Sequence, residues 1–379
     1  MPDVVVIGGG VVGLSIAFAL AVERVSVMVL DAGAPGQASA AAAGMLAPLA
    51  EAGREGPFVP LAVESLSLWP TFVDQLREET ETALRIAGPG MLRVAQTPAE
   101  EAALCTALDW QRGFGLPLHH LNAAELHALE PALGIAVCGG VLSPLERHVE
   151  PRLLLQALRS ACVRRGVVIR TETTATGFKT HGGRVQAVQT QDTRIPGGAY
   201  VVTSGAWSEA VGLNFGVHLP IHPLRGQMLA LGPLHPFPFT HTLYAQSGYL
   251  VPRADGRVIA GATEERVGFD PQTTEAGISS LAAMAAALIP RLSAAPQHSI
   301  WAGLRPVSAD GLPLLGQLPG WDNVHIAAGH GRNGILLTPL TGRLMAAHLL
   351  QDAALPPALS PARFDIPAKQ GDKRCPSQP

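Results

Sequence analysis

Cysteine, charge and metal-binding patterns are scarce in this sequence. Among 379 residues there are four cysteines and no C-x-x-C pair, which favours unpaired thiols in a reducing cytoplasm over a disulfide framework or a zinc site. The 13 histidines are scattered and form no H-E-x-x-H motif, so we expect no metal. A net charge of -3 supplies no basic surface, which argues against nucleic acid as a partner. The four cysteines are Cys105, Cys138, Cys162 and Cys375.

Lysine and arginine are absent from the first 23 residues. Residues 4–22 are nearly all apolar and long enough for a membrane span or a signal sequence. The missing positive n-region and three adjacent glycines, Gly8 to Gly10, argue against both. No other stretch approaches spanning length, so we expect a soluble, cytoplasmic chain with no membrane span. With 47% apolar residues it can bury a large core, which is typical of two domains.

The N-terminal residues 4–31 have the pattern of a dinucleotide site. An apolar strand precedes the G-x-G-x-x-G motif formed by Gly8, Gly10 and Gly13, an apolar helix follows, and a second apolar run ends at Asp31. The three glycines permit a tight turn, close approach of a pyrophosphate and packing of helix on strand. Asp31 stands where a carboxylate would accept the ribose hydroxyls, and it would repel the extra phosphate of NADP. The pattern therefore favours FAD or NAD, against a glycine-rich turn in an ordinary α/β core.

The segment from Gly36 to Pro48 is too small-sided for a core element and too apolar for a surface loop. Such a composition suits close approach of a planar ring system to the backbone. The alternative is an alanine-rich helix of no special role.

Local signals predict the remaining elements. Helices are expected over 61–84 with an interruption near Pro70, from 98 with Thr97 as its cap, and from 123 with Asn122 to Glu125 as a capped start. Further helices are expected from 151 to about 166, over 274–288, and over 335–350 with a break in register at Pro339. Strands are expected over 167–170, 199–203, 225–231, 248–252, 257–260 and 324–328, with Asp255-Gly256 as a hairpin turn. The strands from 225 to 260 predict an antiparallel wall of a second domain.

Two side chains in these elements are candidates for ligand binding. Arg305 lies in an apolar, glycine-flanked stretch, where a guanidinium needs an anion, either a ligand or an internal Asp or Glu. Tyr249 on the predicted wall is as readily a packed aromatic as a ligand contact. Two glycine turns, 204–208 and 329–334, follow predicted strands at the sheet edge where open α/β folds bind ligands.

Taken in order and spacing, several stretches resemble the glycine oxidases of the D-amino acid oxidase family of FAD enzymes. The stretches are Gly8–Gly13, Ala41–Pro48, Val149–Arg152, Arg225–Met228, Tyr249–Arg253, Gly261–Thr263, Trp301–Pro306 and His330–Leu337. The resemblance implies non-covalent FAD, and oxidative deamination of glycine or another small amine or D-amino acid by direct hydride transfer to flavin N5. It further implies oxygen as acceptor with hydrogen peroxide as product, a possible tetramer, and supply of the glycine imine for thiamine thiazole synthesis.

The fold and site expectations follow from the motifs and the resemblance together. We expect an α/β protein with a Rossmann-like FAD-binding domain (1–85, 146–219, 300–365), an antiparallel substrate domain (86–145, 220–299) and a flexible tail (366–379). The resemblance makes Arg305 the carboxylate-binding arginine, Tyr249 the substrate tyrosine and Arg332 an arginine near flavin and substrate. The residues expected to contact FAD are Gly8, Gly10, Val12, Gly13, Asp31, Ala32, Ser39, Ala43, Gly44, Met45, Val168, Gly205, Trp207, Arg305, His330, Gly331, Arg332, Asn333, Gly334 and Ile335.

The sequence also departs from the family pattern. Gly331 stands where many relatives have an aromatic residue, and Glu264-Glu265 follow Thr263 where others differ, so the preferred amine stays open. No cysteine lies near Leu304, so no thioether link to the flavin is expected. Three alternatives remain: an amino acid dehydrogenase that passes electrons to quinone or a carrier, an NAD-dependent dehydrogenase, and a flavin-binding module without turnover.

Overall fold

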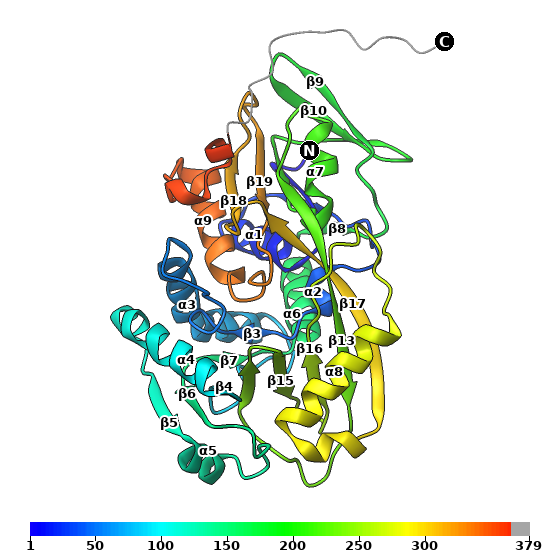
Figure 1. Cartoon of the computed structure of the whole chain (residues 1–379). Coiled ribbons are helices and arrows are strands. Elements are labelled where there is room, and N and C mark those ends of the chain that lie inside the picture. The colour runs from blue at the N-terminus through cyan, green and yellow to red at the C-terminus, as the bar shows by residue number, and fades with distance from the viewer. Residues whose placement is uncertain (365–379) are drawn as a thin grey trace.

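The computed structural model describes residues 1–364, and two large sheets organise them (Figure 1). Cys375 and the predicted tail, 366–379, lie outside the described residues. The first sheet lies in the upper half of Figure 1 and the second in the lower half.

The first sheet has six strands in the order β18-β19-β12-β1-β2-β8. They are β1 (Val4–Ile7), β2 (Val27–Leu30), β8 (Val168–Arg170), β12 (Ala199–Val202), β18 (Leu314–Gln317) and β19 (Val324–Ala328). All neighbours pair in parallel except β18 and β19. The chain leaves β1 toward β2 on one side and later places β12 on the other, so the strand order reverses at β1. Open α/β sheets bind ligands at the carboxyl ends of the strands at such a reversal.

Both faces of this sheet are covered, as the uninterrupted apolar composition of β1 predicts. Val4 and Val6 face a core built with four helices: α1 (Val11–Val22), α3 (Phe58–Glu79), α6 (Pro151–Arg164) and α9 (Thr338–Gln351). Val5 and Ile7 point to the opposite face, because side chains alternate along a strand. There they join a core that includes Tyr200, completely buried.

The second sheet has eight strands in the order β17-β13-β16-β15-β14-β4-β6-β5. They are β4 (Met91–Ala95), β5 (His119–Asn122), β6 (Gly139–Ser143), β13 (Ile221–Leu231), β14 (Thr242–Ala245), β15 (Gly248–Pro252), β16 (Val258–Gly261) and β17 (Gln297–Ser308). The sheet is antiparallel apart from the parallel pair β4 and β14, which the sequence did not predict. Helix α8 (Glu275–Leu288) packs on β13, β15 and β16. Strand β17 spans the predicted domain boundary at 299/300, and the domain bounds stay a prediction.

Smaller elements complete the chain. The three-stranded sheet β9 (Gly177–His181), β10 (Arg184–Gln189) and β11 (Arg194–Pro196) was not predicted, and the pair β3 (Met45–Leu46) and β7 (Arg147–His148) joins distant segments. The remaining α-helices are α2 (Ala38–Ala41), α4 (Pro98–Gln111), α5 (Ala123–Leu129) and α7 (Ser208–Leu213). Predicted caps are confirmed: Thr97 accepts from Glu100 N, and Asn122 forms a capping box with Glu125.

Two predictions about proline were wrong. Helix α3 runs on through Pro70 without interruption, because Pro70 is exposed while Trp69, Phe72 and Leu76 pack into the core and offset the lost backbone hydrogen bond. Pro339 does not break a helix; it occupies the first turn of α9, where a missing N–H has no partner to lose.

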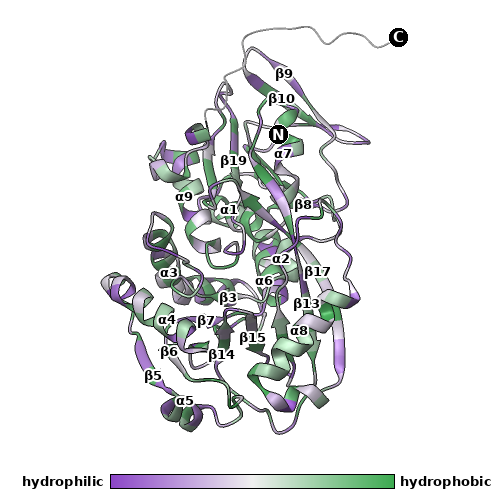
Figure 2. Ribbon diagram, viewed as in Figure 1, coloured by the Kyte–Doolittle hydropathy of each residue, from purple (hydrophilic) through white to green (hydrophobic). Residues whose placement is uncertain are grey.

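Apolar residues concentrate in the interior elements of both halves, and strand β5 at the sheet edge is mostly hydrophilic (Figure 2). Within residues 1–364, no helix combines the length and apolar character needed to cross a bilayer.

Candidate active site

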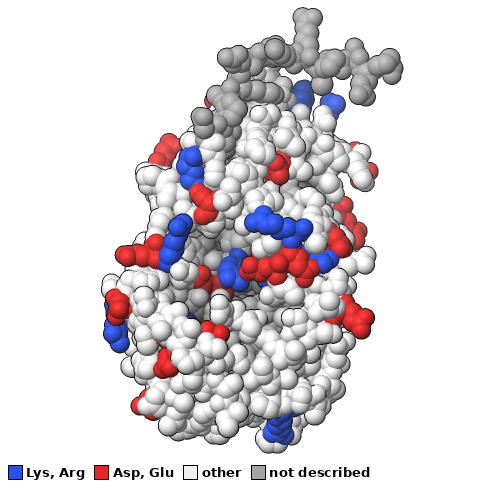
Figure 3. All heavy atoms as spheres, in the orientation of Figure 1, with Lys and Arg blue, Asp and Glu red and all other residues white. Residues whose placement is uncertain are grey.

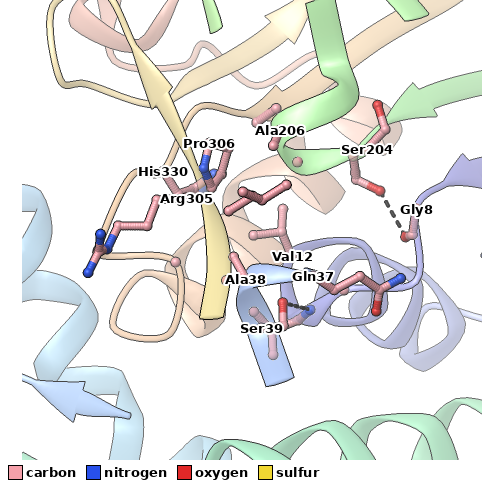
Figure 4. A pocket seen from close by; sticks show the side chains of 18 of the residues that line it. Gly8, Val12, Gln37, Ala38, Ser39, Ser204, Ala206, Arg305, Pro306 and His330 are labelled. Atoms are coloured by element: carbon pink, nitrogen blue, oxygen red, sulfur yellow. Dashed lines mark hydrogen bonds between the residues drawn. The ribbon is translucent and has the colours of Figure 1, made fainter. Parts of the chain in front are cut away.

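One large cavity, about 610 Å³, lies between the two sheets. The first sheet contributes the carboxyl ends of β1, β2, β12 and β19, and the second contributes residues of β13, β15 and β17. We call its two ends the glycine-loop end (Gly8–Val12 with Asp31) and the arginine end (Glu51, Tyr249, Arg305 and Arg332). Figure 4 shows Gly8 and Ser204 at one side of the cavity, and the Arg305 side chain extending from β17 toward the other.

The glycine-loop end presents the start of helix α1 to the cavity. Gly10 is its N-cap and gives no side-chain cap, and the first turn contains no acidic residue. Ser39 Oγ accepts the Val11 N–H at 3.1 Å (Figure 4). The following N–H groups have no intrahelical acceptor, and the helix dipole favours an anion there. This end therefore suits a pyrophosphate.

Glycine is required in this loop by its surroundings. A Cβ on Gly8, which has φ +130°, would lie 2.3 Å from Thr203 O, and one on Gly13 would lie 2.0 Å from Gly8 O. A Cβ on Gly44, with φ +85°, would lie 2.0 Å from Val149 O. The first two keep the loop, strand β12 and helix α1 in close contact, as the motif predicted.

Asp31 is buried at the end of β2. Its Oδ1 accepts from Gln37 Nε2 at 3.0 Å and from Gly33 N at 3.2 Å, and Oδ2 pairs with Arg159. Asp31 lies beside the start of α1, where the sequence predicts a ribose-binding acid, and that role stays a prediction.

The small-residue segment forms the cavity floor between the two ends. Its first half forms the single-turn helix α2, against which strand β17 packs without room for side chains: a Cβ on Gly303 would lie 2.5 Å from Ala41 Cβ. Leu304 N donates to Gly36 O at 2.8 Å, and Trp301 Nε1 to Ala41 O at 3.0 Å. The close approach leaves backbone and small side chains facing the cavity, which suits a flat ring system.

Arg305 reaches the arginine end from β17 and lies across Gly226 of the neighbouring strand, where a Cβ would be 2.4 Å from Arg305 Nη2. Its Nη1 donates to two backbone carbonyls, Thr263 O at 3.0 Å and Arg225 O at 3.5 Å. Within residues 1–364 no Asp or Glu forms an ion pair with Arg305, unlike Arg225, which pairs with Glu265 and Asp270. The guanidinium therefore has donors available for an anion in the cavity.

Tyr249 lies beside Arg305 and is 7% exposed. Its hydroxyl is 3.5 Å from Met228 Sδ, and its ring stacks with that of Tyr244 at 6.3 Å between centroids. Burial raises the pKa of Tyr249, although the charge of Arg305 acts in the opposite direction. The hydroxyl is therefore a neutral hydrogen-bond donor.

Arg332 bridges two carboxylates of very different exposure. Its Nε is 2.8 Å from Glu51 Oε2, and its Nη2 donates to Glu264 Oε1 at 2.8 Å. The Glu51 side chain is 5% exposed, and that of Glu264 is 51% exposed.

Figure 3 shows charged residues gathered in a band across the middle of one face of the molecule, while the lower half of that face is mostly uncharged.

His330 is the second residue of the glycine loop 329–334 and is buried. Its Nε2 lies 3.1 Å from Thr341 Oγ1, and burial lowers its pKa to about 4, so the ring is neutral at pH 7. Gly331 N donates to Pro306 O at 2.8 Å, which ties this loop to β17. A Cβ on Gly331 would meet nothing within 4 Å.

All but two of the residues predicted to bind cofactor or substrate line this cavity. Gly13 lies behind it, in the packing role that the motif gave it. Val168 is a correction: it is half exposed at the start of β8 and does not line the cavity. The segment that does so lies further on, at Thr173–Ala175, since the chain turns back and Thr173 N donates to Asp31 O at 2.9 Å.

The sequence analysis missed Glu51, Arg159 and Gln37 as parts of the site. Glu51 lies three residues beyond the small-residue segment, and a single acid in an otherwise apolar stretch was the available signal. Arg159 belongs to the middle of α6, where nothing in the local pattern distinguishes it from a surface arginine.

Known proteins resemble this chain over nearly its whole length. The family described as "FAD dependent oxidoreductase" (DAO) matches residues 3–348. The glycine oxidase of Geobacillus kaustophilus is 35% identical over 356 residues, which is 91% of this chain and 92% of that protein. A crystal structure of glycine oxidase from the same organism superposes with a TM-score of 0.90 at 32% identity, covering 96% of this chain and 98% of that one. The bifunctional protein ThiO/ThiG of Synechocystis is 36% identical over 96% of this chain, which spans 54% of that protein.

Proposed function

The chain belongs to the DAO family of FAD-dependent oxidoreductases, and on that basis we propose that it catalyses oxidative deamination of glycine or another small amine or D-amino acid. FAD-dependent amine oxidation is the activity class of its relatives. The choice of substrate rests on one observation: the guanidinium of Arg305 lies in the cavity wall and has no acidic partner among the described residues. A small molecule with a carboxylate is the ligand that such a group selects.

The cavity residues fit FAD. The open start of α1 would hold the pyrophosphate, Asp31 the ribose, and the small-residue segment with loop 329–334 the ring system. FAD supplies the acceptor for the two electrons that leave the substrate as hydride. The roles of these residues toward FAD are part of the proposal.

The protein's own contribution to the reaction is mainly positioning. A bidentate contact of Arg305 with the substrate carboxylate fixes the plane of the amino acid, and the Tyr249 hydroxyl donates to a carboxylate oxygen. The second sheet closes this end against water, since β13 and β15 contribute Met228 and Tyr249 to its wall. Arg332, held by Glu51 and Glu264, places a guanidinium beside the same site.

The space at Gly331 bears on the range of substrates. With no side chain in the open space beside the loop, the arginine end can admit amines larger than glycine. We therefore propose a panel of small amines, with glycine, sarcosine, D-alanine and D-proline as first candidates.

Oxygen as electron acceptor, with hydrogen peroxide as product, completes the proposed reaction. The match to a bifunctional ThiO/ThiG protein supports a further proposal, that the imine of glycine feeds thiamine thiazole synthesis. A tetramer also remains a proposal.

The test is anaerobic bleaching of the purified yellow protein by each amine in turn, followed by aerobic turnover with measurement of peroxide. We expect glycine or another small amine to bleach the flavin, and about one peroxide per amine consumed. Bleaching without peroxide would indicate a dehydrogenase that uses quinone or a carrier. Protein that no amine bleaches would contradict the proposed function.

A further inference from the structure

Glu51 is a buried acid in the cavity wall to which the proposed function so far gives no chemical task. Of the described residues that line the cavity, two are carboxylates: Asp31 at the glycine-loop end and Glu51 at the arginine end. Glu51 follows the turn after β3, and its N–H donates to Ala47 O at 3.1 Å. Placing an ionised side chain there costs free energy, so a compensating partner is expected.

The contact of Glu51 with Arg332 leaves part of its hydrogen-bonding capacity unused. Arg332 Nε is 2.8 Å from Oε2, yet no N–H or O–H of the described residues is directed at this buried oxygen with hydrogen-bond geometry. A buried carboxylate oxygen normally accepts a well-directed hydrogen bond, and Oε2 has the ion pair with Arg332 but no such bond among the described residues. A donor on a bound molecule would provide it.

Charged and titratable groups face Glu51 from several elements. Burial raises its pKa, Arg332 and Arg305 lower it, and Glu146 and Glu264 raise it, with a net upward shift. The hydroxyls of Tyr244 and Tyr249 have raised pKa values, chiefly through burial, and remain neutral.

The other nearby acids are unsuited to contact with a bound ligand. Glu146 accepts the N–H groups of Leu49 and Ala50 and does not line the cavity, and Glu264 is half exposed and held by Arg332.

An amino acid substrate arrives with an ammonium group, whereas loss of hydride from Cα requires a lone pair on nitrogen. With the carboxylate at Arg305, the ammonium of a small amino acid remains at the arginine end, where Glu51 is the carboxylate in the wall. We propose that Glu51 accepts a proton from the ammonium group of the substrate held by Arg305. An N–H bond breaks with its electron pair retained on nitrogen, and an O–H bond forms on Glu51. The proton passes to water when product leaves. This inference rests on the proposed function.

The decisive experiment is the pH dependence of anaerobic flavin reduction by glycine, or by the best amine of the panel, in the FAD-loaded Glu51→Gln variant. Without the acceptor, the variant must take substrate that is already neutral, and this fraction rises about tenfold per pH unit below the amine pKa. We expect a loss of about 100-fold at pH 7 that shrinks with unit slope as the pH rises toward that pKa. The wild type should show a shallower dependence, and Glu51→Asp should restore part of the rate at neutral pH.

Glu264→Gln is the matched control, because it removes the other carboxylate on Arg332 and should keep the shape of the wild-type pH profile. Binding of acetate, which lacks the amine, is followed by its perturbation of the flavin spectrum and should be no weaker in Glu51→Gln than in wild type.

A profile parallel to wild type, or loss of acetate binding, would overturn the proton-acceptor role and leave Glu51 a positioning residue for the arginines. The proposed function would survive that result. A wild type that no amine reduces would contradict both.

Discussion

Replacement of Arg305 by alanine tests the substrate assignment most directly. The side chain is held by backbone carbonyls, so its removal leaves no buried carboxylate unpaired and the fold should persist. The truncation would remove the charged donors that face the cavity. A hydrogen bond to a charged group contributes about 1.5–3 kcal/mol, so kcat/KM for glycine should fall about 10- to 100-fold or more.

The loss of kcat/KM in Arg305→Ala can come from weaker substrate binding, from slower flavin reduction, or from both. If Arg305 also orients the amino acid, the limiting rate of anaerobic flavin reduction should fall together with substrate affinity, because misalignment costs rate as well as binding. Stopped-flow reduction at several glycine concentrations separates the two. Arg305→Lys should recover part of the affinity and little of the rate, since an ammonium lacks the planar fork.

Arg184→Ala is a suitable control for the loss of one arginine. Arg184 lies on β10 with its side chain 55% exposed and 3.8 Å from Asp322, so its removal should leave glycine oxidation unchanged. If Arg305→Ala retained kcat/KM within about threefold of wild type, the carboxylate site would have to be elsewhere.

Three further predictions concern packing and pH. Gly226→Ala places a methyl 2.4 Å from Arg305 Nη2, so the guanidinium must shift and KM for glycine should rise about tenfold in steady-state assays. Gly13→Ala brings a Cβ 2.0 Å from Gly8 O, a backbone atom that cannot move aside as a flexible side chain could. The FAD content measured by absorbance should therefore drop, and the free energy of unfolding should fall by about 1–3 kcal/mol. Burial, with a smaller contribution from a nearby arginine, lowers the pKa of His148 to about 3. Below about pH 6.5 the unfolded chain therefore binds a proton that the folded chain does not, so the free energy of unfolding decreases as the pH is lowered. The excess stability of wild type over His148→Gln in urea titrations should therefore shrink by about 2 kcal/mol from pH 6.5 to pH 5.

Controls for these variants come from the same chain. A Cβ on Gly113 meets nothing within 4 Å, so Gly113→Ala should affect neither KM nor FAD content. Wild-type KM in Gly226→Ala, full FAD content in Gly13→Ala, or a His148→Gln difference that is constant with pH would each contradict the corresponding argument.

The sequence predicted those parts of the fold that local chemistry determines. The βαβ unit at the N-terminus, the caps at Thr97 and Asn122, and the hairpin at Asp255-Gly256 depend on residues a few positions apart, and each formed as expected. The parallel pairing of β4 with β14 joins residues about 150 positions apart, and no local pattern encodes it. Proline was misjudged for a related reason, because its effect at Pro70 depends on which face of α3 is buried.

Sequence reasoning located the cavity best where backbone conformation carries the signal, and the binding roles of these residues stay predictions. Glycine loops can be recognised in the sequence, because few other residues fit their turns and close contacts. Nearly all predicted cofactor residues line one cavity. Val168 was misplaced because the strand was recognised but the turn that follows it was not. Glu51 was missed because its importance arises from Arg332, which is 281 positions away in the sequence.

Strand β17 explains why the residues proposed to bind cofactor and substrate line one cavity. Within three consecutive residues it approaches the small-residue segment at Gly303, bonds to Gly36 through Leu304 N and directs Arg305 into the arginine end. The next residue, Pro306, accepts the N–H of Gly331 and so fixes the second glycine loop. Because β17 contacts both the small-residue segment and the loop 329–334, a displacement of either segment would also displace the guanidinium of Arg305. The distance between the proposed ring site and the proposed carboxylate site is therefore set by backbone pairing, which varies less than side-chain rotamers, and the proposed hydride transfer requires that constancy.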